Sequence, residues 1–202
     1  MSRTETPLWW LTKDSDLDCA ELYERHYSRY RYADGRARDN DQFVGPGRKL
    51  VLRTERADAV FAWRDFIDDC IDERTGRPQE GINCAVFRNE SEHRSSDLIR
   101  QADTVADVGW GYRRHYTYVD PTEVRSTNPG FCFIAAGWRR CGRTKGGLIV
   151  LERPANAHDY DDDSVCRRCG FDGAEWWHLE RMKRKQDRDP EPPCSALGEI
   201  DG

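Results

Sequence analysis

Hydrophobic residues follow two spacings between residues 8 and 152, and each spacing predicts one type of secondary structure. Short apolar runs bounded by turn residues predict strands, and apolar residues three or four positions apart predict helices. Strands are expected at residues 8–11, 49–53, 57–63, 81–87, 115–119, 138–143 and 148–152. Helices are expected at 17–30 and from Ser95 or Ser96 to Gly109 or Gly111, whereas 131–136 fits helix or strand equally by its length. The pattern therefore predicts a mixed α/β (α+β) domain.

The run from Ile82 to Phe87 is almost continuously apolar, which is typical of a strand buried on both faces. We therefore expect it at the centre of the sheet. Arg88 follows directly, so its side chain is expected at the carboxyl edge, where ligands of open sheets commonly bind. A structural ion pair with Glu90 is the alternative for this arginine.

Composition and charge narrow the possible classes of protein. The chain has 202 residues, enough for one ordinary core, and its aromatic content of 11% is too high for a disordered protein. With 37 acidic and 32 basic residues the net charge is −5, which excludes nucleic-acid binding through overall charge alone. Residues 1–7 are polar and no apolar run approaches the length of a membrane span, so we expect a cytoplasmic protein without a membrane partner.

The distribution of acidic, cysteine and proline residues predicts the domain organisation. Residues 1–153 are expected to form the domain, 154–165 an acidic linker, 166–188 a basic segment with cysteines, and 189–202 a disordered tail. Cys166 and Cys169 have the spacing of a metal knuckle, with His178 and Cys194 as the nearest further ligands. These four residues are candidate zinc ligands, and free thiols are the alternative.

The order of the predicted elements, together with the end of the domain, resembles the GNAT acetyltransferase superfamily. The ending comprises Asn128, the segment 131–136, the pair Gly137-Trp138 and a closing hairpin. The resemblance implies a GNAT-like mixed central sheet flanked by helices, with acetyl-CoA or another activated donor as the cofactor.

In that superfamily an Arg or Gln and two glycines usually bind the donor phosphates between the central strand and the next helix. The corresponding stretch here is Arg94-Ser95-Ser96-Asp97. Helix N-terminal amides and serine hydroxyls can bind phosphate, but the missing glycines and the charge of Asp97 oppose it. The two serines are alternatively ordinary helix caps.

Within the superfamily, three segments look similar to the bacteriophage Mom DNA-modification proteins and their bacterial relatives: His26-Tyr27-Ser28-Arg29, Phe87-Arg88-Asn89-Glu90 and Arg94-Ser95-Ser96. The resemblance implies transfer of a carbamoylmethyl-type group to the exocyclic amine of adenine in duplex DNA, which protects the DNA from restriction. It also implies that His26, Tyr27 and Arg88 are functional positions, with iron as a candidate active-site metal.

Individual candidate residues have structural alternatives. His26 and Tyr27 are suited to proton or metal chemistry, but they are equally a surface histidine beside a core tyrosine. Asp120 is a candidate for polarising an amine or His26, and it also precedes a proline, as ordinary turn residues do. Tyr116 and Tyr118 share one strand face, where they either stack on a base or pack in the core.

Two clusters of arginine suggest a groove for double-stranded DNA: Arg139, Arg140, Arg143 and Lys145 in the final hairpin, and Arg25, Arg29, Arg31, Arg36 and Arg38 near the first helix. Chemistry on a base requires its extrusion from the duplex, and Trp138 or Tyr30 is expected to stack on it. Asp34, Asp39 and Asp41 lie among the arginines, so a solvated surface of mixed charge is the alternative.

These observations favour a transferase that acts on a nucleobase amine in DNA. A CoA-dependent N-acetyltransferase of a small amine or a protein is the first alternative, and calorimetry with acetyl-CoA would separate the two. A non-catalytic GNAT-like binding module is the second alternative, supported by the altered stretch 94–97. The sequence leaves the donor, the acceptor and the oligomeric state open.

Overall fold

The structure is a computed structural model that describes residues 7–34, 41–65, 71–72, 77–78 and 80–155. The predicted linker, cysteine segment and tail lie outside the described residues apart from residues 154 and 155, and so do Arg36 and Arg38. The candidate zinc ligands Cys166, Cys169, His178 and Cys194 also lie outside.

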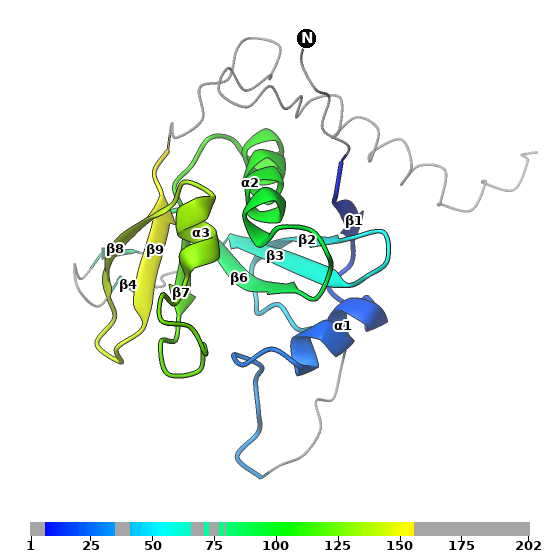
Figure 1. Ribbon diagram of the computed structural model, residues 1–202, viewed down its shortest axis with the longest axis horizontal. Helices are drawn as coiled ribbons and strands as arrows, with labels where there is room; N and C mark the ends of the chain where they lie inside the picture. The colour runs from blue at the N-terminus through cyan, green and yellow to red at the C-terminus, as the bar shows by residue number, and fades with distance from the viewer. Residues whose placement is uncertain (1–6, 35–40, 66–70, 73–76, 79, 156–202) are drawn as a thin grey trace, which may run out of the picture.

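A seven-stranded mixed sheet forms the centre of the described domain (Figure 1). The strands lie in the order β1 (Trp10–Thr12), β2 (Arg48–Arg53), β3 (Ala59–Asp65), β6 (Ile82–Asn89), β7 (His115–Val119), β9 (Ile149–Arg153), β8 (Arg139–Arg143). β6 and β7 are parallel, and the other neighbours are antiparallel. A separate antiparallel pair, β4 (Ile71–Asp72) and β5 (Arg77–Pro78), lies between β3 and β6 in the chain. The predicted mixed architecture with a central strand at β6 is confirmed.

The helices cover both faces of this sheet, which gives three layers (Figure 1). α1 (Leu17–Glu24) packs on β3 and β6 through Leu22 and Tyr23, against Val60 and Val86. α2 (Ser95–Trp110) and α3 (Phe131–Ala135) lie on the opposite face. The apolar side of α2 joins a second and larger core there, which explains why β6 reads as apolar on both faces.

α1 is shorter than the predicted helix at 17–30, because the chain turns back after Glu24. The N–H of His26 bonds to the carbonyl of Tyr23, and the N–H of Tyr30 donates to the Tyr23 hydroxyl at 2.7 Å. The helix is capped by Asp16, whose carboxylate accepts from the N–H of Cys19. His26 and Tyr27 consequently lie in a turn beyond the helix.

The segment with ambiguous periodicity, 131–136, forms α3. Gly130 precedes it with φ of 80°, a left-handed conformation that favours glycine. A Cβ at this position would lie 2.5 Å from Cδ1 of Leu151. Glycine therefore lets α3 approach β9 closely at the point where the helix begins.

A β-bulge in β6 decides which side chains face which layer. Val86 pairs with Ala62 and Cys84 with Trp63, so Ala85 has no partner in β3. Cys84 and Phe87 both join the core beneath α2, although their separation of three residues would place them on opposite faces of a regular strand. The bulge thus turns Arg88 toward α1 and Asn89 toward the start of α2.

β6 and β7 are paired at two positions, Ile82 with His115 and Asn83 with Tyr116. Both strands continue for several residues beyond these pairs without further pairing to each other along their described lengths. The sheet therefore opens between its two parallel strands, toward their carboxyl ends. This opening positions the candidate site.

Candidate functional site

A cavity of about 940 Å³ lies between the diverging strands. Its walls come from β6, β7, the turn after α1, the first residue of α2 and two residues of α3. Five tyrosines contribute to the lining: Tyr23, Tyr27, Tyr30, Tyr32 and Tyr118. The location agrees with the general rule that open sheets bind ligands where strands separate at their carboxyl ends.

His26 lines this cavity and is only 9% exposed. The N–H of Ser28 donates to Nδ1 at 3.1 Å, so Nδ1 carries the lone pair and the neutral ring holds its proton on Nε2. The Ser28 hydroxyl lies 2.8 Å from the same nitrogen. Burial, assisted by the nearby Arg88 guanidinium, lowers the pKa of His26 to about 4. His26 is therefore a neutral imidazole at pH 7 and a weak base.

Tyr27 also lines the cavity, and its ring stacks on His26 with 4.5 Å between centroids. Burial raises the pKa of its phenol, and a hydrogen bond with the backbone of Asp120 opposes this only in part. The hydroxyl consequently stays protonated at neutral pH. It is suited to donating a hydrogen bond or a proton to a group inside the cavity.

Arg88 lies at the end of β6, as predicted, but it is not among the residues that line the described cavity. Its Nε donates to Glu90 at 2.6 Å and its Nη1 to the carbonyl of Arg25 at 2.5 Å. Glu90 also binds Arg25 through two hydrogen bonds of 2.9 Å, and these contacts lower the pKa of Glu90 to about 2. The cluster joins the end of β6 to the turn after α1, which is the structural alternative considered for Arg88.

Asp120 lies immediately after β7 and borders the cavity. Its Oδ1 accepts hydrogen bonds from the N–H of Thr122 at 2.9 Å and from the Thr122 hydroxyl at 2.7 Å. These bonds lower the pKa of Asp120, so the carboxylate is ionised. Its oxygen is committed to the local turn, as in other turns that begin with aspartate.

The start of α2 opens on the same cavity through Ser95. Arg94 occupies the N-cap position and its side chain makes no capping bond, so the two serines are not caps as one alternative had it. The Ser95 hydroxyl accepts from Asn89 at 3.0 Å and retains its own hydrogen as a donor. Asp97 pairs with Arg100 one turn later, which balances the negative charge that opposed phosphate binding.

Two aromatic side chains expected to stack on a base differ in exposure. Trp138 is 3% exposed and donates through Nε1 to Asp103 at 2.9 Å, so the stacking role predicted for it is wrong. Tyr30 is 62% exposed, lines the cavity and makes an edge contact with Tyr32. Tyr116 is fully buried, whereas Tyr118 is partly exposed at the cavity wall.

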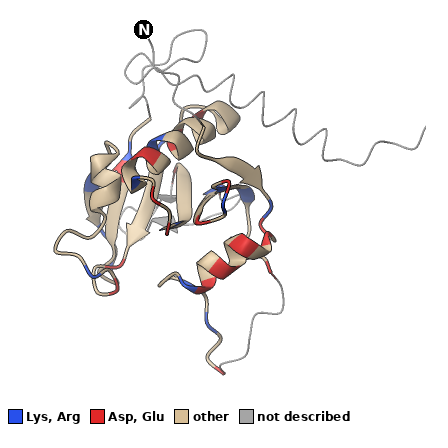
Figure 2. Cartoon of the chain, turned by 45° about the vertical axis from the view of Figure 1, so that its right-hand side comes forward, with Lys and Arg blue, Asp and Glu red and all other residues tan. Residues whose placement is uncertain are grey.

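Five of the described arginines of the two predicted basic clusters, Arg25, Arg29, Arg139, Arg140 and Arg143, bind nearby groups of their own chain. Arg139 pairs with Glu152, Arg140 bonds to the side chain of Asn128, and Arg143 bonds to the carbonyl of Gly147. Arg29 bonds to the carbonyl of Glu24. Figure 2 shows acidic positions along α1, the helix that precedes the first basic cluster. The described surface thus fits the alternative of mixed charge.

The potential metal ligands described around the cavity are not gathered as a site for the iron that the resemblance implied. No group of three His, Cys, Asp or Glu side chains lies close enough to hold a metal among the residues that the structure describes. Beside His26, the lining contains the carboxylates of Asp120 and Glu123 and the thiols of Cys84 and Cys132, and burial raises the pKa of both thiols. No chemical step is therefore assigned to iron.

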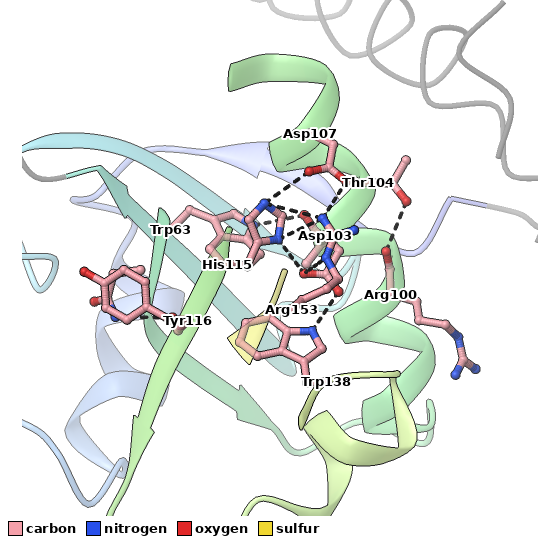
Figure 3. Close-up of polar contacts among 11 residues, drawn as sticks. Trp63, Arg100, Asp103, Thr104, Asp107, His115, Tyr116, Trp138 and Arg153 are labelled. Atoms are coloured by element: carbon pink, nitrogen blue, oxygen red, sulfur yellow. Dashed lines mark hydrogen bonds and ion pairs between the residues drawn. The ribbon is translucent and has the colours of Figure 1, made fainter. Parts of the chain in front are cut away.

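Two sets of residues were not identified by sequence reasoning. Asn83 is a buried amide at the point where β6 and β7 separate, and its only sequence signal is its isolation within an apolar run. The second set is a buried polar network beneath α2, drawn in Figure 3 and formed by Asp103, Asp107, His115, Trp138 and Arg153. Asp103 and Asp107 are one helical turn apart, which is the signal that this network left in the sequence.

Comparison of the chain with known protein families, with curated proteins and with solved structures found no match. Among the described helices, none combines the length and the apolar character needed to cross a bilayer. The functional conclusion therefore depends on the geometry of the cavity and on the residues around it.

Proposed function

We propose that this chain is a GNAT-like transferase that modifies the exocyclic amine of adenine in DNA. The observation that carries the proposal is the convergence of the segment 26–29 and the distant stretch 87–96 on one cavity. The segments 26–29, 87–90 and 94–96, which resemble Mom-like proteins, contribute His26, Tyr27, Phe87, Asn89 and Ser95 to its lining. Segments that are far apart in sequence and meet at one cavity are expected of a binding site rather than of local packing.

The start of α2 is suited to hold the phosphates of an activated donor. α2 has 16 residues, so its N-terminal amides and dipole attract an anion, and Arg94, Ser95 and Ser96 add a positive charge and two hydroxyls. A CoA-type donor would supply a carbon activated for attack by an amine. The Asp97–Arg100 pair keeps the local charge from repelling such a group.

Two other side chains of the cavity lining are suited to the acceptor. The exposed faces of Tyr30 and Tyr118 offer stacking surfaces for an extruded base. During transfer the amine nitrogen bonds to the activated carbon, the bond from that carbon to the leaving group breaks, and the amine loses one proton. Tyr27 is suited to protonate the leaving group, and the proton that the amine loses then restores the Tyr27 hydroxyl, because neutral His26, whose pKa is about 4, is too weak a base to take that proton at pH 7.

The decisive experiment is mass spectrometry of nucleosides from plasmid DNA after expression of the protein in a bacterial host. We expect a new adenosine-derived mass, reduced roughly 100-fold or more in Tyr27→Phe. Tyr112→Phe is the matched control, because Tyr112 is an exposed tyrosine that does not border the cavity, and it should modify DNA normally. Unmodified DNA recovered with folded wild-type protein would refute the proposal.

A CoA-dependent N-acetyltransferase of a small amine or a protein is the second candidate. The pairing of Asp97 with Arg100 favours it, because it removes the charge that argued against acetyl-CoA at the start of α2. Calorimetry with acetyl-CoA tests this candidate directly. Tight binding of acetyl-CoA together with unmodified DNA would select it. A protein that neither binds acetyl-CoA nor modifies DNA would leave the non-catalytic binding module.

A further inference from the structure

Asn83 is a polar side chain in an otherwise apolar part of β6, and it is only 4% exposed. It lines the cavity at the last position where β6 pairs with β7, opposite Tyr116. Burying an amide without hydrogen bonds costs about 1–3 kcal/mol, so an asparagine here requires partners.

One hydrogen bond fixes the orientation of this amide. Nδ2 of Asn83 donates to the backbone carbonyl of Tyr116 at 3.3 Å. A carbonyl oxygen only accepts hydrogen bonds, so the nitrogen rather than the oxygen of the amide must face it. Within the described part of the chain, no group donates to Oδ1 of Asn83. The site therefore presents an acceptor and, on Nδ2, a second hydrogen.

Three other acceptor atoms around the cavity already accept hydrogen bonds from the protein. Nδ1 of His26 accepts from Ser28, and Oδ1 of Asp120 accepts from Thr122. Oδ1 of Asn89 accepts from both the N–H and the hydroxyl of Ser91. An amine that enters the cavity can therefore donate to the carboxamide oxygen of Asn83 more readily than to these three atoms.

We propose that Oδ1 of Asn83 accepts a hydrogen bond from the exocyclic amine that receives the transferred group. This inference rests on the proposed function and adds a positioning residue to it. One N–H of the amine is held by Asn83, which leaves the nitrogen lone pair to face the activated carbon. The second hydrogen on Nδ2 complements a ring nitrogen next to the amine, the pairing by which asparagine reads adenine.

The test compares two DNA duplexes by fluorescence anisotropy. One contains an adenine opposite an abasic site, which eases extrusion of the base, and the other contains purine without the amino group at the same position. We expect the wild-type protein to bind the adenine duplex on the order of tenfold more tightly, the contribution of one hydrogen bond in a buried site. Asn83→Leu should bind both duplexes equally.

Gln101→Leu is the matched control, because Gln101 is a buried amide that does not line the cavity. Its Oε1 accepts from the N–H of Leu8 at 2.8 Å. It should keep the preference for adenine. If Asn83→Leu does not fold, as judged by circular dichroism, Asn83→Ser replaces it. The serine hydroxyl can still donate to a backbone carbonyl but is too short to reach the amine.

The outcomes separate this inference from the function on which it rests. Wild-type protein that modifies adenine in plasmid DNA but binds both duplexes equally would overturn the role of Asn83 and leave the function intact. Wild-type protein that neither modifies nor binds DNA would overturn both. Preference for adenine that persists in Asn83→Leu would also overturn the role of Asn83.

Discussion

Two histidine-containing regions of the domain differ in what surrounds the imidazole. Beneath α2, His115 lies with Nδ1 2.8 Å from Asp103 and Nε2 3.2 Å from Asp107, in a network closed by Trp138 and Arg153 (Figure 3). On the opposite face, His26 has a serine and backbone groups as partners and borders a cavity.

The buried network is suited to stabilising the fold, whereas the cavity side is suited to binding a ligand. Every carboxylate of the buried network has a cationic or N–H partner, and none of the five side chains lines the cavity. Such a closed network joins α2 to β7, to β9 and to Trp138 just before β8, and it lies away from the cavity. The cavity side, by contrast, includes Oδ1 of Asn83, to which no described group donates, and the Ser95 hydroxyl, which keeps a hydrogen to donate.

The strongest test of this comparison removes the cation from the buried network. Arg153→Leu leaves Asp103 and Asp107 without their guanidinium partner, and we expect the free energy of unfolding to fall by about 3–5 kcal/mol. Arg139→Leu, which removes an exposed partner of Glu152, should cost less than about 1 kcal/mol. Urea denaturation measures both, and equal losses would show that the buried network is not special.

A second test uses the pH dependence that His26 imposes. Its pKa is about 4 in the folded protein and ordinarily 6.5, so between these values the unfolded chain binds a proton that the folded protein does not. Stability should therefore decrease as the pH falls from 6.5 toward 4, by roughly 2–3 kcal/mol from this group. His26→Gln should flatten the dependence in urea denaturation at pH 6.5 and 4.5. An unchanged slope would mean that His26 is not buried as described.

A third test compares two threonine hydroxyls that each donate to a backbone carbonyl, one beside the cavity and one in α2. Thr117 donates to the carbonyl of Cys84 at 2.9 Å, across the opening between β6 and β7. Thr117→Val should lower the free energy of unfolding by about 1 kcal/mol. Thr104→Val in α2 should cost less, because the carbonyl of Arg100 that Thr104 contacts belongs to a helix. Thermal melts of both variants measure the two losses. A larger loss in Thr104→Val would show that other contacts join β6 to β7 at this point.

The smallest effect is expected at the ion-pair cluster near the cavity. Glu90→Gln weakens the pairs with Arg25 and Arg88, which are partly exposed, so we expect a loss of at most about 1 kcal/mol. The loss should shrink in 1 M salt, because exposed charges are screened. Melting temperatures at low and high salt measure it. A loss as large as that of Arg153→Leu would make this cluster, too, a structural network.

The sequence predicted the strands well because their signal is local. The run at 82–87 identified β6 as central, and the strand 115–119 coincides with β7, since buried strands require apolar residues at consecutive or alternating positions. The helix at 17–30 was too long, because Tyr27 continues the periodicity of Tyr23 although the chain has already turned after Glu24. For the same reason His26 and Tyr27 were expected near the end of the helix instead of beyond it.

The candidate site was located in part. The segments around His26, Arg88 and Ser95 do meet at one end of the molecule. Which of their side chains face the cavity was not predictable, because the bulge at Ala85 reverses the alternation of β6 and its sequence carries no mark of it. The same bulge directs Arg88 toward Arg25 and Glu90.

The sequence by itself determined the elements, their order and the mixed sheet, because each depends on the spacing of apolar residues over a few positions. Tertiary structure decided which polar groups are satisfied. Asp103 meets His115, Trp138 and Arg153 from three different strands or their ends, and Asn83 keeps a vacant acceptor because β7 diverges from β6 beside it. Such partnerships join residues that are distant in sequence, so no local pattern encodes them, and they alone distinguish the closed network from the open site.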